Sequence, residues 1–424
     1  MNPPTTASKT LVCLIGLTIA VFFSSIATAA PPSKDLSDAH EAAKWRTRRI
    51  IMNNDGNDFN RIDPSVEVTP ETFLAQRTTP LLGSHVDSIF YCTGVFNLYT
   101  HKSDETELHA SPKSAARNVH KLLDKGTDSL EMMTRFCRDN NIEVFWSMRM
   151  NDTHDSSKDH ADIFCQWKKD HPDWLVGKRG VKYPYGSGRW SAVDYNQAGV
   201  RDKVFRIFED VCTRYDIDGI ELDFFRHPVV FKEQMTGKPI TDAQRELMTD
   251  LIRRIRKITQ EVAAQRGRPM LIAVRVPDSV AYCKALGLDL ETWLDEELVD
   301  IVTNGCYFRF NDWDYLVGLG KKHNVPVYAC FESRRIQPDT KEAEEATSLE
   351  IWRGEAYQAW KAGVNGIYTF NRFNPRDPIF RELGDPKLLE TLERQDQSVL
   401  ANPKLGFKPG RFVKGGERLV RQKK

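Results

Sequence analysis

The 424-residue sequence predicts a single-domain (β/α)8 barrel, or TIM barrel, of the α/β class. Three observations predict this fold: eight short apolar segments, amphipathic helical repeats between them, and a short glycine turn before the last apolar segment. Eight such units in a row close a barrel more naturally than they form an open sheet. An open doubly wound sheet is the alternative, but residues 53–57, after the first strand, lack its usual GxGxxG pattern.

The predicted strands are rich in Val, Ile, Phe and Tyr, as buried parallel strands are. They are Arg49–Asn53, Ser88–Thr93, Glu143–Met148, Gly219–Phe224, Met270–Val276, Ile301–Tyr307, Val325–Phe331 and Gly366–Phe370. The main predicted helices follow from apolar residues that repeat with a helical period. They are Ser129–Asn140, Val200–Tyr215, Asp242–Arg266, Leu290–Glu297, Tyr315–His323, Leu349–Ala362 and Pro386–Arg394. The barrel is therefore expected over residues 45–395.

Two predicted connections are longer than a barrel requires, Gly94–Lys113 after the second strand and Asn151–Gln197 after the third. Long loops in compact domains are usually functional or disordered. Both follow strand ends on the face where barrel enzymes hold their active sites. The second loop is rich in aromatic residues such as Trp174 and Trp190, which we expect either to stack on sugar rings or to form a small core.

The first residues have the features of a signal peptide rather than of a folded element. Lys9 supplies a positive charge, an apolar segment runs from Leu11 to Phe23, and Ala27-Thr28-Ala29 offers small residues for cleavage. We therefore expect residues 1–29 to be a signal peptide, residues 30–44 to be a linker, and the mature protein to be exported to the periplasm or secreted. An uncleaved N-terminal anchor is the alternative.

The charge of the chain is balanced, with 60 basic and 59 acidic residues. This balance argues against a nucleic acid or a membrane surface as a partner, since either would favour a basic excess. No later segment reaches the length of a membrane span. Only the extension over residues 396–424 is basic, and we expect it to be a solvated tail, with a binding arm as the alternative.

Several chemistries lack their residues. The sequence holds no HxH at the first strand and no HExxH, which argues against a zinc hydrolase. No lysine lies on the second to eighth predicted strands, and no GxSxG motif is present, so a Schiff-base aldolase and a serine hydrolase lack their nucleophiles. We therefore expect no cofactor and no metal site, although a divalent ion held by carboxylates alone stays open.

The fourth predicted strand carries two carboxylates, Glu221 and Asp223, on one face. Both should point into the barrel near its top, because Ile220 and Leu222 point toward the helices. Buried carboxylates are costly unless they are paired or used. Glu221 has an alternative interpretation as a structural ion pair with Arg149 or Arg275, since it lies one layer deeper.

The seventh predicted strand ends at Glu332, which should face Asp223 across the barrel mouth. Two facing carboxylates are what glycoside hydrolysis needs, because one protonates the leaving oxygen and the other attacks or activates water. We therefore predict Asp223 and Glu332 as the catalytic pair, with Glu221 as a supporting or alternative acid. A salt bridge from Glu332 to Arg334 or Arg335 is the alternative.

Polar side chains near most strand ends and in the loops are the predicted substrate contacts. Amide and guanidinium donors in such positions suit a polyhydroxylated substrate and are compatible with an anionic one. The predicted contacts are Asn53, Trp146, Arg149, Asn151, Asp194, Arg226, His227, Arg275, Tyr307 and Asn371.

The stretch that begins at His171-Pro172-Asp173-Trp174-Leu175 and continues through Ser191-Ala192-Val193-Asp194-Tyr195-Asn196 to residues 215–226 resembles the glycosyl-hydrolase-like barrel families. These are predicted bacterial glycosidases near glycosyl-hydrolase-like family 10, and the resemblance covers residues 45 to 395. It implies a catalytic acidic residue at the end of strand four, which Asp223 matches. The segment is also similar to the fourth strand of α-amylases, but Glu221 stands where those enzymes have a basic residue.

Together these features predict a glycoside hydrolase that acts on an extracellular oligo- or polysaccharide. A non-catalytic carbohydrate-binding barrel and a metal-assisted hydrolase or lyase are the alternatives. The sugar, the linkage, the stereochemical outcome and the oligomeric state do not follow from the sequence.

Overall fold

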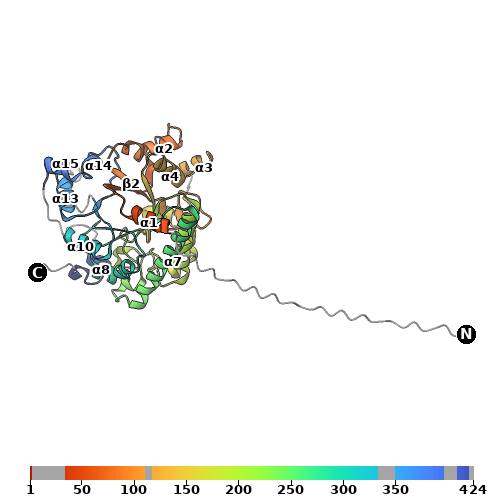
Figure 1. The fold of residues 1–424 in the computed structure, drawn as a ribbon. Coiled ribbons are helices and arrows are strands. Elements are labelled where there is room, and N and C mark those ends of the chain that lie inside the picture. Colours follow the sequence, from red (N-terminus) through yellow and green to blue (C-terminus); the bar gives the residue numbers. More distant parts are fainter. Residues whose placement is uncertain (2–33, 110–116, 333–348, 396–407, 420–424) are drawn as a thin grey trace. The chain divides into compact units, whose positions relative to one another are not determined.

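The computed structural model describes Met1 and residues 34–109, 117–332, 349–395 and 408–419. Within this part of the chain, eight parallel strands form a closed barrel in the order β1-β11-β10-β9-β8-β7-β6-β2 (Figure 1). They are β1 Ile50–Asn54, β2 Val86–Tyr91, β6 Glu143–Arg149, β7 Gly219–Asp223, β8 Leu271–Val276, β9 Ile301–Asn304, β10 Val327–Glu332 and β11 Gly366–Phe370. The predicted (β/α)8 barrel is confirmed, and each strand overlaps its predicted segment.

The strands are apolar because both of their faces are buried, one inside the barrel and the other beneath the helices. All residues of β1, β6, β7 and β11 are buried. The sixth predicted strand is shorter than expected, because β9 ends before Gly305, where φ is +96°. A left-handed conformation interrupts the ladder. A Cβ atom at Gly305 would also lie 2.8 Å from the Trp313 ring, so the turn requires glycine.

Helices surround the strands in the expected order. They are α1 Lys34–Lys44, α2 Pro70–Arg77, α3 Arg117–Leu123, α4 Ser129–Asp139, α5 Gln166–Asp170, α6 Ala198–Arg214, α7 Asp242–Arg266, α8 Val280–Leu286, α9 Leu290–Asp295, α10 Trp313–His323, α13 Leu349–Ala362, α14 Ile379–Glu382, α15 Pro386–Thr391 and α16 Pro409–Phe412. The long helix α7 has local signals at both ends. Thr241 and Gln244 form a reciprocal capping box, and Gly267, with φ of +63°, ends the helix.

Both long loops carry structure of their own. The loop after β2 forms a small sheet of β3 Gly94–Val95, β4 Leu98–Tyr99 and β5 Glu107–Leu108. The loop after β6 holds α5 and the 3-10 turns η3 His154–Ser156, η4 Lys158–Ile163, η5 Pro172–Trp174 and η6 Gly186–Gly188. The rings of His171 and Trp174 stack at 4.2 Å between centroids, with Trp167 against His171 at 4.7 Å. These rings form the small core that was one of the two expected roles for the aromatic residues of this loop.

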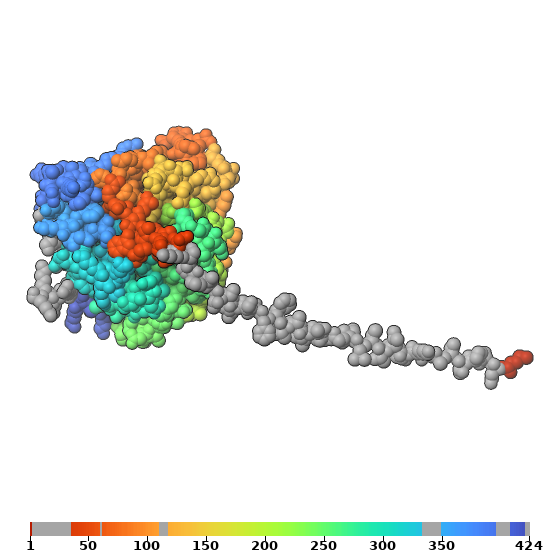
Figure 2. All heavy atoms as spheres, in the orientation of Figure 1, coloured from red at the N-terminus to blue at the C-terminus, as the bar shows by residue number. Residues whose placement is uncertain are grey.

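The segments on either side of the barrel carry more structure than the sequence predicts. Residues 34–44, expected to belong to a linker, form α1, which lies over the centre of the ring of later segments (Figure 2). Within the predicted basic tail, α16 and the 3-10 turn η8 Gly416–Leu419 pack on the barrel domain: Phe412 is buried, and the Tyr282 hydroxyl donates to the Pro409 carbonyl at 2.9 Å.

The predicted signal peptide lies outside the described residues. No helix in the described ranges is long and apolar enough to cross a membrane.

Arg48 closes the end of the barrel beneath α1. Its guanidinium forms two parallel hydrogen bonds to Glu143 on β6, at 2.6 and 2.7 Å, and it donates to the carbonyls of Ala43 and Lys44 at the end of α1. Glu143 also accepts from the Ser88 hydroxyl of β2 at 2.6 Å. One buried ion pair thus joins α1, β2 and β6. Breaking such a pair leaves a buried charge without its partner, which costs about 3–5 kcal/mol.

We expect Glu143→Gln to lower the free energy of unfolding by about 3–5 kcal/mol, because Arg48 would stay buried without a countercharge. Urea unfolding followed by circular dichroism measures this change. The matched control is Glu131→Gln, which breaks a surface pair with Arg135 on α4 and should cost less than about 1 kcal/mol. Equal effects of the two substitutions would contradict the role assigned to the Arg48–Glu143 pair.

Candidate active site

The carboxyl ends of the strands bring charged and aromatic side chains together, and Glu221 lies deepest among them. Its Oε2 accepts hydrogen bonds from the hydroxyls of Ser147 on β6 and Tyr368 on β11, the latter at 3.0 Å. Glu221 is 0% exposed, and its Oε1 has no hydrogen-bond partner among the described residues. Burial raises the pKa of Glu221 to about 7, and the charge of Asp223 acts in the same direction.

Asp223 lies one layer above Glu221 and forms a buried ion pair with Arg275 of β8. Strand register places the two residues directly opposite each other. The other carboxylate oxygen of Asp223 accepts from the backbone N–H groups of Phe225 and Arg226, both at 2.9 Å. The Arg275 guanidinium also lies 3.9 Å from the centre of the Phe370 ring. All of these contacts to Asp223 come from N–H donors, so they are the contacts of a carboxylate anion.

Glu332 ends β10 and is buried at the same end of the barrel. Its Oε1 accepts from the side-chain amide of Asn371 at 3.0 Å. Asn371 follows β11 with φ of +56°, a left-handed conformation that asparagine adopts more readily than most residues. Burial raises the pKa of the nearby Tyr307; Arg226 opposes this shift and the charge of Glu332 adds to it. Glu332, Tyr307 and Arg226 therefore share one electrostatic environment.

A chain of hydrogen bonds crosses the mouth from β9 toward β6. Arg226 donates from one guanidinium nitrogen to the Tyr307 hydroxyl and from the other to Nε2 of His154, the latter at 2.8 Å. Because Nε2 of His154 accepts, its proton lies on Nδ1, which contacts Oδ1 of Asp152 at 2.7 Å. Asp152 in turn accepts from Arg149 at 3.1 Å. This chain holds Arg226 in place between the two halves of the mouth.

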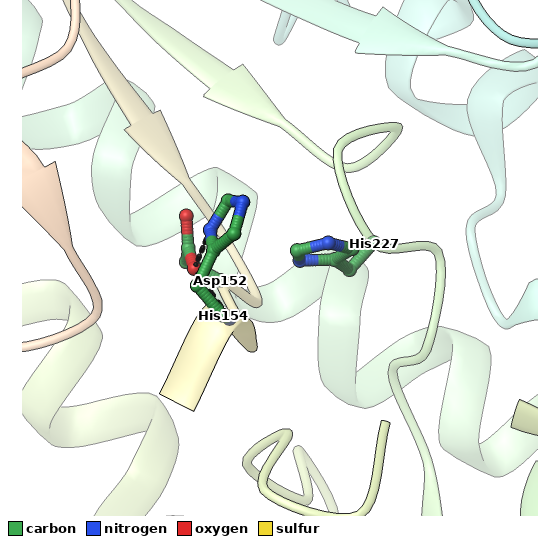
Figure 3. Close-up of side chains that lie close together, drawn as sticks. All are labelled: Asp152, His154 and His227. Carbon is green, nitrogen blue, oxygen red and sulfur yellow. Dashed lines mark hydrogen bonds and ion pairs between the residues drawn. The ribbon is translucent and has the colours of Figure 1, made fainter. Parts of the chain in front are cut away.

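Asp152, His154 and His227 lie close enough to resemble a metal site, with potential ligand atoms within 4.8 Å of one another (Figure 3). Their hydrogen bonds do not fit that role. The backbone N–H of Thr153 donates to Nδ1 of His227 at 3.0 Å, so Nε2 of His227 carries the proton. His154 uses Nε2 to accept from Arg226 and Nδ1 to donate to Asp152. In this arrangement neither imidazole has a lone pair left for a metal ion.

The surrounding charges also oppose a cation at this cluster. Burial lowers the pKa of His227 well below its usual range, and the positive charges of Arg189 and Arg226 lower it further. Burial lowers the pKa of Arg189 as well, and the charge of Arg226 adds to that effect. Both guanidinium groups therefore oppose a cation here, although the Asp152 carboxylate acts in the opposite direction on His227 and Arg189.

A cavity of about 380 Å3 opens beside this network, above the carboxyl ends of β1, β2, β6 and β7. Its lining includes Asp55, Thr93, Arg149, His154 and Arg226. The volume falls within the range of roughly 300–1,000 Å3 that is usual for ligand pockets. A larger cavity of about 760 Å3 lies beside α1 at the opposite end of the barrel. We place the site at the carboxyl end, because Asp223 and Glu332 end their strands there and Arg149 ends β6.

Most of the predicted site residues lie at this end. They lie at the mouth, in its hydrogen-bond chain or in the layer directly below it. These residues are Glu221, Asp223, Glu332, Arg149, Arg226, His227, Arg275, Tyr307 and Asn371. Arg275, one of the two predicted partners of Glu221, pairs with Asp223 instead. Arg334 and Arg335, the alternative partners of Glu332, lie outside the described residues.

Trp146 is wrongly placed among the substrate contacts. It is fully buried, its ring packs against Phe208 of α6 at 5.5 Å between centroids, and its indole N–H donates to Thr93 at 2.9 Å. Residues alternate along β6, so Trp146 faces the helices when Ser147 and Arg149 face the interior. A substrate at the mouth cannot reach this side chain.

Asn151, Asp194 and Asn53 are buried and hydrogen-bonded to backbone groups. The amide of Asn151 donates to and accepts from the backbone of Val193, which fastens the long loop to β6. Asp194 accepts from the backbone N–H groups of Asn196 and Lys232. Asn53 is buried and donates to the Phe90 carbonyl of β2 at 3.3 Å. These side chains satisfy buried backbone groups, and their contact with a substrate stays a prediction.

Three members of the site are not among the residues predicted from the sequence. Tyr368 supports Glu221, and the alternation rule could have found it, because it lies two residues before the inward-facing Phe370. His154 and Arg189 come from the long loop after β6, where no periodicity indicates which side chains return to the mouth. A histidine shortly after a strand end was the only available signal for His154.

No family model and no curated protein matches the chain. Similar solved structures include the GH36 alpha-galactosidase AgaA of Geobacillus stearothermophilus, at 12% identity and a TM-score of 0.43, covering 83% of this chain and 44% of that one. Alpha-L-fucosidase isoenzyme 2 of Paenibacillus thiaminolyticus has 13% identity, a TM-score of 0.47 and coverages of 81% and 49%. The PgaB (BpsB) glycoside hydrolase domain of Bordetella bronchiseptica has 12% identity, a TM-score of 0.45 and coverages of 80% and 98%.

The chain spans less than half the length of the α-galactosidase and of the fucosidase. These likenesses are distant. What the residues of this chain do must therefore be judged from their own geometry and charge.

The buried Glu221 makes stability depend on pH. Its ordinary pKa is 4.5, so between about pH 4.5 and 7 the folded protein holds a proton that the unfolded chain releases. Stability from this group therefore falls as pH rises through that window, by roughly 3 kcal/mol when the shift is converted to free energy. Glu221→Gln, which carries no charge, should be more stable than the wild type at pH 8 and should show no such gain at pH 4.5.

Urea unfolding of both proteins at the two pH values measures this difference, with Glu131→Gln as the exposed control. A gain from Glu221→Gln of the same size at both pH values would show that the proton on Glu221 is not its cause.

Proposed function

We propose that the chain is an exported glycoside hydrolase that cleaves an oligo- or polysaccharide with Asp223 and Glu332 as its carboxylate pair. The observation that supports this proposal is the placement of both carboxylates at the carboxyl ends of barrel strands, each held by a donor from the next strand along. Arg275 holds Asp223, and Asn371 holds Glu332. Paired carboxylates in different environments are the requirement for cleaving a glycosidic bond.

The contacts of Asp223 favour one of the two roles. Asp223 is held by a guanidinium and two backbone N–H groups, which suits a permanent anion that attacks the anomeric carbon, activates water or stabilises positive charge. Glu332 ends β10 and accepts from the Asn371 amide. In the proposed mechanism Asp223 faces the developing charge on the sugar, and Glu332, as the other carboxyl of the pair, donates a proton to the leaving oxygen.

Glu221 acts as a positioning residue in this mechanism. It lies beneath Asp223 and is sealed from solvent by Ser147 and Tyr368. With a pKa raised to about 7, it is largely protonated in mildly acidic conditions, which keeps a second negative charge away from Asp223. A single negative charge in this layer preserves the ion pair between Asp223 and Arg275.

The substitutions Asp223→Asn and Glu332→Gln test the pair. Each should lower kcat/KM at least about 100-fold on any saccharide that the wild type cleaves, because acid–base catalysis contributes roughly 10²–10⁴-fold. A panel of polysaccharides, assayed for release of reducing ends, identifies a substrate, and NMR of the first-formed anomer then gives the stereochemical course.

The matched controls are Asp139→Asn at the exposed end of α4 and Glu131→Gln, which should retain wild-type rates. Unfolding midpoints verify that each variant is folded. Wild-type rates in a folded Asp223→Asn or Glu332→Gln would remove that residue from the mechanism. Saccharide binding without turnover would favour the non-catalytic carbohydrate-binding barrel.

A further inference from the structure

We propose that Arg226 is the centre of an anion subsite that binds a carboxylate or sulfate group carried by the saccharide. The proposal rests on the proposed glycosidase function and names its substrate class as an acidic rather than a neutral glycan. It follows from the partners of Arg226, from the donors that face the same region and from the cavity beside it.

Arg226 is held by neutral acceptors alone. Its side chain donates to the Tyr307 hydroxyl and to Nε2 of His154, and among the described residues no carboxylate lies within 4.0 Å of its guanidinium. Its Nε is buried and has no hydrogen-bond partner in that part of the chain. A partly buried guanidinium without a countercharge is costly unless a ligand supplies the negative charge.

Other arginines at the strand ends have such a partner. Arg149, Arg275, Arg309 and Arg372 each lie near or beyond the carboxyl end of a barrel strand, and each lies within 4.0 Å of a carboxylate. Their partners are Asp152, Asp223, Glu355 and Asp377, respectively. The contrast indicates that the countercharge of Arg226 comes from a ligand rather than from the described part of the protein.

A second buried donor lies close to Arg226. His227 is 2% exposed, its Nδ1 accepts from the backbone N–H of Thr153, and its Nε2–H has no hydrogen-bond partner among the described residues. Its ring centre lies 5.1 Å from that of His154, which contacts Arg226. The positive charge of Arg189 also acts on both His227 and Arg226. An oxyanion is the ligand that satisfies N–H donors and guanidinium charge together.

The position of Arg226 connects this subsite to the cavity and to the proposed catalytic pair. Arg226 lines the cavity of about 380 Å3 together with His154 and Arg149. Its backbone N–H donates to Asp223, and its guanidinium reaches Tyr307, whose surroundings include Glu332. A sugar whose anionic group binds Arg226 would therefore lie next to the residue whose backbone holds Asp223 and close to the Tyr307 hydroxyl. A uronic acid and a sugar sulfate ester both offer the required group.

Direct binding tests the subsite without requiring turnover. Isothermal titration at low salt compares D-glucuronate, D-galacturonate, glucose 6-sulfate and inorganic sulfate with neutral glucose and galactose. Acidic probes should bind the wild type at least about tenfold more tightly than their neutral counterparts, because a hydrogen bond to a charged group contributes roughly 1.5–3 kcal/mol. The uronate and sulfate arms show which anion the site prefers.

Arg226→Gln should weaken the acidic probes at least about tenfold and leave the neutral sugars unchanged. Arg226→Lys, which keeps the charge but loses the planar pair of donors, should fall between the two. The control Arg135→Gln on the exposed face of α4 should bind like the wild type. The unfolding midpoint of each variant verifies its fold.

The proposal is overturned if acidic probes bind no more tightly than neutral ones, or if folded Arg226→Gln keeps the preference for acids. The outcome is separable from that of the glycosidase proposal. Loss of acid binding in Arg226→Gln supports the subsite even when Asp223→Asn leaves catalysis unchanged. Cleavage of neutral glycans that depends on Asp223 but not on Arg226 supports the glycosidase and removes the subsite.

Discussion

Closing eight strands into a barrel removes the interior from water, so each inward-pointing polar side chain must find its partner on another strand. This constraint organises the molecule at both ends. At the amino end, Arg48 reaches Glu143 and the carbonyls of α1. At the carboxyl end, Asp223 reaches Arg275, while the carboxyl of Glu221 is held between Ser147 and Tyr368. The first arrangement holds the barrel together, and the second prepares charges where a substrate can use them.

Charged side chains at the mouth form ion pairs, and this pairing determines what the other charged groups there can bind. Arg275 neutralises Asp223 and Arg149 neutralises Asp152, whereas the guanidinium of Arg226 contacts neutral acceptors among the described side chains. A guanidinium in such a setting can accept a ligand's negative charge while its neutral contacts hold it in place. The proposed chemistry and the proposed specificity thus follow from the same distribution of ion pairs.

The sequence predicts the barrel and the inward direction of Glu221 and Asp223 because both depend on local periodicity. The choice of ion-pair partner depends on register between strands, which sets Asp223 opposite Arg275 and which periodicity within one strand does not reveal. Strict alternation along β6 places Trp146 on the helix-facing side, because it lies one position from the inward-facing Ser147. His154 and Arg189 belong to a loop of more than forty residues whose path is decided by packing, so no repeating pattern indicated them.

Arg226 contributes to both proposals, through its backbone N–H and through its guanidinium. Its backbone N–H holds one oxygen of Asp223 at 2.9 Å, while its guanidinium faces the cavity and contacts Tyr307. Because one residue makes both contacts, the distance from a ligand anion on the guanidinium to Asp223 would be fixed by Arg226 itself. It would not depend on the motion of separate loops. Fixing a substrate in this way lowers the entropic cost of bringing its anomeric carbon to the carboxylates, which is a large part of what an active site contributes to rate. The hydrogen bonds to Tyr307 and His154 hold the guanidinium in place before the ligand arrives, so little of the binding free energy is lost in ordering the side chain.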